Sequence, residues 1–180
     1  RGELGEQLDR SVVDSIGMAG TLVNALAVAA ELRRRDLPAR VLSAFDVPRL
    51  ADLYTPASAR SALERGEIVL LAGGTGNTHF TTDTAAALRA LETGCMLLIK
   101  ATKVDGVYSA DPVREPSAER FKHLTFDEVL RRKLGVMDLT AITLCMENAL
   151  PVVVLNAKRA GSVRAYLRGE SLGTLIEADA

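Results

Sequence analysis

Apolar residues recur at helical spacing between about Val12 and Arg35, and this run is the longest periodic pattern in the chain. It closes in three arginines, which suit the negative end of a helix dipole. The pattern predicts a long, mostly buried helix. Its longest uncharged stretch, residues 16–30, is interrupted by glycine and polar residues and is shorter than the roughly 20 residues that span a bilayer. We therefore expect no membrane segment.

Shorter apolar runs alternate with further helical patterns along the rest of the chain. The expected strands are 40–44, 67–72, 95–99, 151–155 and 174–176, of which 67–72 and 95–99 read as covered on both faces. The expected helices are 55–66, 84–92, 125–133, 139–149 and 162–167, with Thr82 and Asp83 capping the second of them. This alternation predicts a three-layer α/β/α sandwich with a largely parallel sheet, built as one domain over residues 1–180.

The composition is that of a folded chain, and it argues against nucleic acid and anionic membranes as partners. The 180 residues are 48% hydrophobic and carry a net charge of −1, which excludes a disordered chain and gives no basic footprint for nucleic acid or an anionic membrane. Cys95 and Cys145 match no metal or redox spacing and are expected to be buried hydrophobes. No signal peptide is visible, so we expect a cytoplasmic protein. No metal-ligand set is predicted.

A glycine-rich loop, GGTGNTHFTTD from Gly73 to Asp83, lies between an expected strand and an expected helix. Flexible backbone amides and a helix N-terminus at such a place can surround a phosphate. The loop is neither a Walker sequence nor a dinucleotide fingerprint. On these residues alone, an ordinary tight connection is an equal alternative.

A second segment, KATKVDGVYSADP from Lys100 to Pro112, leaves the next expected strand at the sheet edge where open α/β folds bind ligands. Its lysines can neutralise phosphate, Tyr108 can lie against a base, and its aspartates can accept from a ribose or ligate Mg²⁺. Residues 101–120 are expected to form an ordered loop with room for a short hairpin. Taken alone, the segment favours interpretation as a solvated charged loop over a ligand site. The cluster at residues 131–133 reads as a solvated helix end, and Asp138 as a helix cap.

Taken together, these segments closely resemble the bacterial uridylate (UMP) kinases of the amino acid kinase superfamily. The resemblance rests on DSIGMAGTLVN from Asp14, on both loops just described, on VMDL from Val136 and on GTLI from Gly173, and it covers essentially the whole chain. The superfamily's first strand, early lysine-containing phosphate segment and triple-glycine loop have no counterpart here. We therefore expect the chain to be a fragment that lacks the N-terminal part of the fold.

The resemblance implies a role for individual residues. Asp14 is similar to the carboxylate that holds the ribose of UMP, and Asp83 matches a carboxylate that helps order the reacting phosphates and the catalytic lysine. Asp83 and Lys100 are the expected catalytic residues. The implied contacts to uracil and phosphate are Thr75, Gly76, Asn77, Thr78, His79, Phe80, Thr81 and Thr82. The implied contacts to ATP are Arg1, Thr102, Tyr108 and Asp111.

The same resemblance implies transfer of the γ-phosphoryl group of ATP, carried with Mg²⁺, to UMP in pyrimidine nucleotide biosynthesis. It also implies a homohexamer that GTP activates and UTP inhibits. Two alternatives stay open. One is a relative that acts on acetylglutamate, aspartate or a carbamate-like acid, although residues 75–82 hold no cation for a substrate carboxylate. The other is a nucleotide-binding or oxyanion-storage oligomer without kinase activity.

Overall fold

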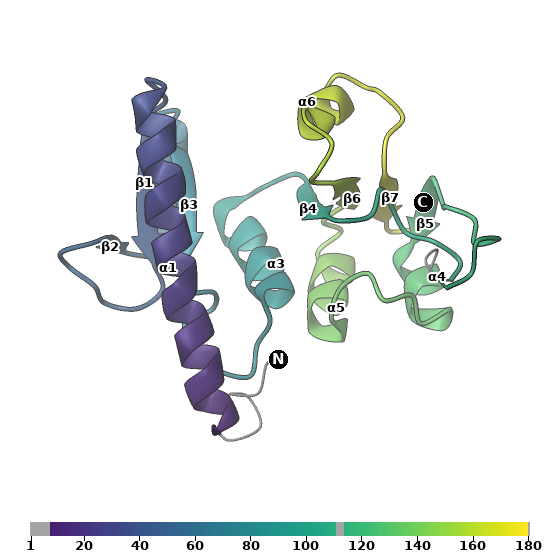
Figure 1. Ribbon diagram of the computed structural model, residues 1–180, viewed down its shortest axis with the longest axis horizontal. Coiled ribbons are helices and arrows are strands. Elements are labelled where there is room, and N and C mark those ends of the chain that lie inside the picture. The colour runs from purple at the N-terminus through teal and green to yellow at the C-terminus, as the bar shows by residue number, and fades with distance from the viewer. Residues whose placement is uncertain (1–7, 111–113, 180) are drawn as a thin grey trace. The chain divides into compact units, whose positions relative to one another are not determined.

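A computed structural model describes residues 8–110 and 114–179 and divides the chain into two compact units, residues 1–94 and 95–180 (Figure 1). Each unit contains its own sheet and is described by itself. The single domain over residues 1–180 stays a prediction.

The first unit is built around a three-stranded parallel sheet with the order β2-β1-β3. Its elements are α1 (Arg10–Arg34), β1 (Ala39–Ser43), β2 (Asp52–Leu53), α2 (Pro56–Glu64), β3 (Ile68–Ala72) and α3 (Thr82–Thr93). Strand β3 pairs with β1 along its whole length but is an edge strand, with Ile68 and Leu71 exposed. The prediction that this strand is covered on both faces was therefore wrong.

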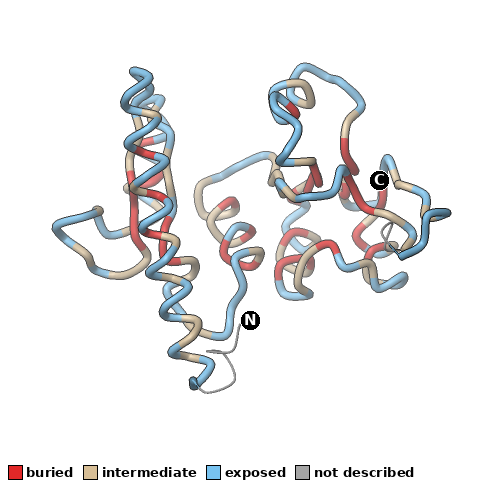
Figure 2. The backbone as a smooth tube through the Cα atoms, viewed as in Figure 1, coloured by how far each residue is buried: buried red, intermediate tan, exposed pale blue. Residues whose placement is uncertain are grey.

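Helix α1 packs one narrow face against β1 and β3. Leu22, Ala25 and Ala29 join Val41 and Ala72 in a small core cluster, and Figure 2 shows these buried positions along the helix and the strands behind it. The rest of the helix is open.

The expectation of a mostly buried helix was wrong, because Ile16 is 60% exposed and Val23 is 67% exposed. Among the described residues, α1 is the one helix long and apolar enough to cross a membrane by length and composition. Those two properties do not separate a membrane span from a helix that packs on a sheet.

The N-cap of helix α3 lies one residue before the first of the two expected cap residues. Thr81, and not Thr82 or Asp83, is the N-cap, and its hydroxyl accepts from the amides of Asp83 and Thr84. The helix ends at Gly94 in the left-handed conformation that glycine adopts without strain. Asp83 therefore lies inside the first turn, where a carboxylate favours the helix dipole.

The second unit contains a four-stranded sheet with the order β4-β6-β7-β5. Its elements are β4 (Leu98–Thr102), β5 (His123–Thr125), α4 (Phe126–Arg131), α5 (Leu139–Glu147), β6 (Val152–Asn156), α6 (Ser162–Leu167) and β7 (Thr174–Glu177). The β6–β7 pair is antiparallel and the other two pairs are parallel. Helices α5 and α6 lie on opposite faces of the β4–β6 part of this sheet (Figure 1).

Two expectations in this unit need correction. Strand β4 begins at Leu98, three residues after the expected start, because Leu98 to Thr102 is the stretch that pairs with β6, and its residues are only half-buried. Cys95 consequently precedes the strand and is exposed. Cys145 is buried as expected, and burial raises the pKa of its thiol to about 11. The mixed α/β class with parallel strands is confirmed.

Candidate functional site

The glycine-rich loop of the first unit folds tightly against the end of β1. Gly73, Gly74 and Gly76 all have positive φ. A Cβ atom on Gly73 would lie 2.7 Å from the Phe45 ring, and one on Gly76 would lie 3.0 Å from the Ala44 carbonyl oxygen. Glycine is required here for the backbone conformation and for the close approach.

Helix α1 fixes this loop at two points. The amide of Gly73 donates to Thr21 Oγ1 at 2.8 Å, and the amide of His79 donates to Asp14 Oδ2 at 2.7 Å. His79 itself has a φ of 70°, so this contact stabilises a strained backbone. The hydrogen bond from the His79 amide holds the pKa of Asp14 below its usual value, and nearby Arg10 acts in the same direction.

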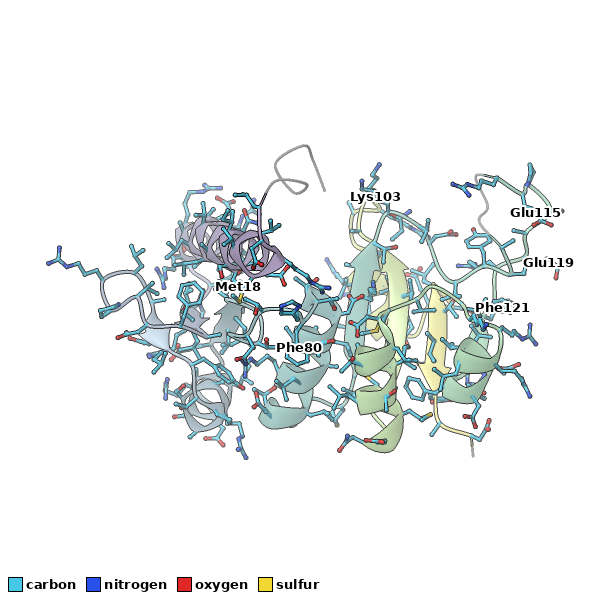
Figure 3. The ribbon with its side chains drawn as sticks, turned by 90° about the horizontal axis from the view of Figure 1, so that it is seen from below. Met18, Phe80, Lys103, Glu115, Glu119 and Phe121 are labelled. Carbon is cyan, nitrogen blue, oxygen red and sulfur yellow. The ribbon has the colours of Figure 1, made fainter. Side chains whose placement is uncertain are left out.

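A cavity of about 210 Å³ lies between α1 and the loop. Figure 3 shows Met18 of α1 and Phe80 of the loop, both of which line it. Its lining consists of Val13, Asp14, Gly17, Met18, Thr21, Gly74, Thr75, Asn77, Phe80, Thr81 and Thr82. The site thus combines a carboxylate, threonine hydroxyls, an amide side chain and apolar atoms, a mixture suited to a small polar ligand.

The structure brings together most of the residues expected at this place. Asp14, Thr75, Asn77, Phe80, Thr81 and Thr82 line the cavity. Gly76, Thr78 and His79 belong to the same loop but not to that lining. Sequence reasoning assigned no role to Thr21, although its hydroxyl anchors the loop.

The second unit holds a larger cavity of about 590 Å³ beside the C-terminal half of β4. Lys100 and Thr102 line it, and Lys100 Nζ donates to the Val136 carbonyl at 2.7 Å. The full lining is Lys100, Thr102, Val104, Gly106, Val107, Tyr108, Ser109, Ala110, Arg132, Lys133, Leu134, Gly135, Val136 and Val154. The lining thus combines three cationic side chains, one aromatic ring and several apolar side chains. This combination suits a large anionic ligand with a flat apolar part.

Tyr108 lies in the short hairpin that the sequence allowed for. It forms an antiparallel bridge with Arg120, and its hydroxyl donates to Asp105 Oδ1 at 2.7 Å. This hydrogen bond raises the pKa of Tyr108, so the hydroxyl stays protonated at neutral pH. The hairpin base is held by Thr174, whose Oγ1 accepts from the Val107 amide at 2.8 Å.

Arg132 and Lys133 are exposed at the end of α4, as expected for a solvated helix end, and both also line this cavity. A left-handed turn at Lys133, with a φ of 52°, carries the chain round to Val136. The run of cations at this helix end was the only sequence sign that these residues could bind an anion, and such a run is equally typical of a helix end on the surface. Asp138 caps α5 as expected, accepting from the Ala141 amide at 3.1 Å.

Four expected site residues need separate mention. Arg1 and Asp111 lie outside the described residues. Asp83 lies in the first unit, at the start of α3, and Lys100 lies in the second, on β4, and each is described only within its own unit. Among residues 8–110 and 114–179, no group of three or more His, Cys, Asp or Glu side chains could hold a metal ion.

Comparison with known proteins gives a consistent result. The sequence profile of the amino acid kinase family matches residues 2–156. A uridylate kinase of Ectopseudomonas mendocina (strain ymp) is 50% identical over 173 residues, which is 96% of this chain and 70% of the relative. A uridylate kinase of Stutzerimonas stutzeri (strain A1501) is 49% identical over 170 residues, 94% of this chain and 69% of the relative.

Solved structures agree with these sequence matches. A UMP kinase from Bacillus anthracis matches with a TM-score of 0.96 and 34% identity, covering 100% of this chain and 75% of that one. A UMP kinase from Ureaplasma parvum matches with a TM-score of 0.93 and 32% identity, covering 98% of this chain and 77% of that one.

Proposed function

This chain belongs to the amino acid kinase family and is a phosphotransferase, and on that premise we propose that it transfers the γ-phosphoryl group of Mg·ATP to UMP. The oxygen of the UMP phosphate forms the new bond to phosphorus while the bond to the β,γ-bridging oxygen breaks, giving UDP and ADP. The observation that carries the proposal is the Asp14–His79 contact. It joins the carboxylate and the loop that the family resemblance assigns to one nucleotide.

UMP is the proposed ligand of the first unit's cavity. Asp14 uses Oδ2 for the His79 amide, and a carboxylate has two oxygens with about four acceptor positions, so ribose hydroxyls can donate to Oδ1. Threonine hydroxyls and loop amides then surround uracil and the phosphate. The N-terminus of α3, twelve residues long, adds a favourable dipole for an anion.

ATP is the proposed ligand of the second unit's cavity. Its volume of about 590 Å³ is within the range of nucleotide-sized sites. Lys100, Arg132 and Lys133 supply positive charge for phosphates, and Tyr108 supplies a ring for a base. Phosphoryl transfer needs little covalent work from the protein, since positioning and charge stabilisation account for most of the rate. Magnesium belongs to the proposed substrate complex Mg·ATP, and Asp83 is proposed to help order the reacting phosphates.

A coupled assay of ADP release tests the proposal, with UMP, Mg²⁺ and ATP supplied to residues 1–180 and to the full gene product in parallel. Formation of UDP is expected from the full gene product. UMP binding without turnover in either protein would instead favour a nucleotide-binding oligomer. Turnover with acetylglutamate or aspartate but not UMP would favour another amino acid kinase activity.

Replacing Asp14 with asparagine tests the assignment of the UMP site. Asparagine keeps the shape but removes the charge that attracts the His79 amide and the proposed ribose hydroxyls. We expect KM for UMP to rise by about 10-fold, as for loss of one charge-assisted hydrogen bond, with KM for ATP little changed. Steady-state kinetics with each substrate varied in turn gives both constants. Glu31→Gln, on the exposed far end of α1, is the matched control, and an equal rise in both KM values would contradict the assignment.

Assembly, regulation and location belong to the same proposal. A homohexamer would cover the exposed apolar residues of α1, among them Ile16 and Val23. Light scattering of the full gene product tests this, and a monomeric mass would contradict it. Activation by GTP, inhibition by UTP, a cytoplasmic location and a place in pyrimidine nucleotide synthesis follow from the resemblance and are proposed with it.

A further inference from the structure

Arg89 of α3 contacts three separate parts of the first unit through one guanidinium group. Its Nη1 lies 2.7 Å from Glu92 Oε2, and its Nη2 donates to the Gly74 carbonyl at 3.1 Å. The group also lies over the Tyr54 ring, with Cζ 3.9 Å from the ring centroid. Its side chain is only 12% exposed, so these contacts are shielded from water.

Glu92 and Tyr54 complete the cluster. The Tyr54 hydroxyl donates to the same Glu92 oxygen at 2.7 Å, and the Tyr54 amide donates to the Ser43 carbonyl at the end of β1. Burial, with the Glu92 hydrogen bond, raises the pKa of Tyr54 to about 12, so its hydroxyl remains a donor at any physiological pH. The cluster therefore links the end of β1, the middle of α3 and the glycine-rich loop.

Arg89 makes more contacts, and reaches further along the sequence, than an arginine in an ordinary ion pair on a helix surface. Arg89 and Glu92 have the i, i+3 spacing of such pairs, which contribute only about 0.3–0.5 kcal/mol when exposed. The contact to Gly74 spans 15 residues and reaches a loop that α3 itself does not contain. The planar fork of arginine makes both contacts at once, which a point-like ammonium cannot do.

The Gly74 carbonyl is a sensitive place for such a contact. The peptide unit is planar and trans, so a Gly74 oxygen directed at Arg89 leaves the Thr75 amide directed away from it. Gly74 has a φ of 61° and no Cβ, so rotation of this peptide unit meets little steric resistance from its own residue. Thr75 and Gly74 both line the cavity between α1 and the loop.

We propose that Arg89 is a positioning residue for the nucleotide-acceptor loop: by holding the Gly74 carbonyl, it fixes the orientation of the 74–75 peptide unit and the geometry in which the loop receives UMP. This inference rests on the proposed function for the identity of the ligand. Arg89 itself has no place in the lining of that cavity. Its effect passes through Gly74.

Arg89→Met and Arg89→Lys test the proposal in the full gene product. Methionine keeps most of the apolar stem, whereas lysine also keeps a positive charge beside Glu92 but lacks the fork. We expect KM for UMP to rise by about 10-fold or more in both variants, since small misplacements of binding groups have large effects on rate and affinity. KM for ATP is expected to stay within about 2-fold of the parent, because the proposed ATP contacts lie in the other unit.

Arg34→Met is the matched control, because Arg34 forms an i, i+3 pair with Glu31 at 2.8 Å and has no contact with the loop. Both KM values are expected to remain at the parent's level in this variant. Equal KM values for UMP in Arg89→Lys and the parent would overturn the proposal. So would a matched rise of both KM values with a lowered Tm, which would mark a general loss of stability.

Hydrogen exchange separates this inference from the proposed function. In Arg89→Lys, amides of residues 74–79 are expected to exchange at least about 10-fold faster, while those of β3 keep the parent's rate. This readout needs no turnover, so it stands even if the protein does not phosphorylate UMP. Unchanged exchange across residues 74–79 would overturn the inference whatever the assay with UMP gives.

Discussion

Lys100→Met is expected to lower the turnover number of the full gene product by about 10²–10³-fold, the usual effect of removing one donor that stabilises transition-state charge. Lys100 is on β4, and its side chain enters the cavity proposed for ATP. Methionine keeps an apolar side chain of similar length to that of lysine. The substitution therefore removes the positive charge while it retains most of the packing contacts. Coupled ADP-release kinetics at saturating UMP and ATP gives the number directly.

The Val136 carbonyl accepts from Lys100 Nζ, so the substitution also removes a structural hydrogen bond. A lost partner of this kind costs about 1–3 kcal/mol, which thermal unfolding measures independently. Lys122→Met, an exposed lysine of the same unit outside the cavity, is the control. A turnover number equal to that of the parent in Lys100→Met would exclude Lys100 from phosphoryl transfer. Partial recovery in Lys100→Arg is expected, because the charge is retained with altered geometry.

Gly173→Ala is expected to destabilise the second unit by about 3–5 kcal/mol, a loss in the range of severe core substitutions. Gly173 precedes β7 with a φ of 74°, and a Cβ atom there would lie 2.3 Å from the Val154 carbonyl oxygen. It would also lie 2.6 Å from Leu155 Cδ2. Both neighbours belong to β6, the strand between β4 and β7 in the sheet, where the backbone cannot move away.

Gly169→Ala provides a matched comparison, because Gly169 has a φ of 91° and nothing within 4 Å of an added Cβ. The left-handed conformation alone costs about 1–2 kcal/mol for alanine. The difference between the two variants in urea unfolding therefore isolates the steric contact with β6. Equal losses in the two variants would contradict the close approach at Gly173.

Local sequence signals predicted much of the fold, because caps and apolar runs act over short distances. The Asp138 cap is confirmed, and α4 begins directly after Thr125, the residue at which its helix was expected to start. Strand β2 was not expected, since two exposed residues, Asp52 and Leu53, carry no apolar pattern and are ordered only by pairing with β1.

Errors arose where burial depends on a neighbour that the sequence does not specify. The apolar run of α1 predicted a mostly buried helix, but the sheet covers only the face with Leu22, Ala25 and Ala29. The run around Cys95 predicted a buried strand, but pairing with β6 begins only at Leu98. Period and composition indicate which residues can be buried, and the available partner surface determines which of them are.

The parts of the candidate site that depend on neighbouring residues in the sequence could be predicted, and the contacts between distant residues could not. Glycine content located the loop of residues 73–76, and Asp14 came from the family resemblance. The contact of Arg89 with Gly74 could not be predicted, because an arginine three residues before a glutamate in a helix is typical of a solvated surface pair. The place of Arg132 and Lys133 in the lining of the second unit's cavity could not be predicted either, because cations at a helix end are typical of a solvated surface.

The order of strands in the second unit has a consequence for synthesis of the chain on the ribosome. Strand β7 is late in the sequence but lies between β6 and β5 in the sheet. Strand β5 pairs only with β7 among the described strands, so residues 123–125 cannot join the sheet until residues 174–177 have emerged. At roughly 5–20 residues per second, this leaves β5 without its partner for several seconds in every round of translation. Residues 123–125 are therefore accessible to proteases and chaperones throughout this interval.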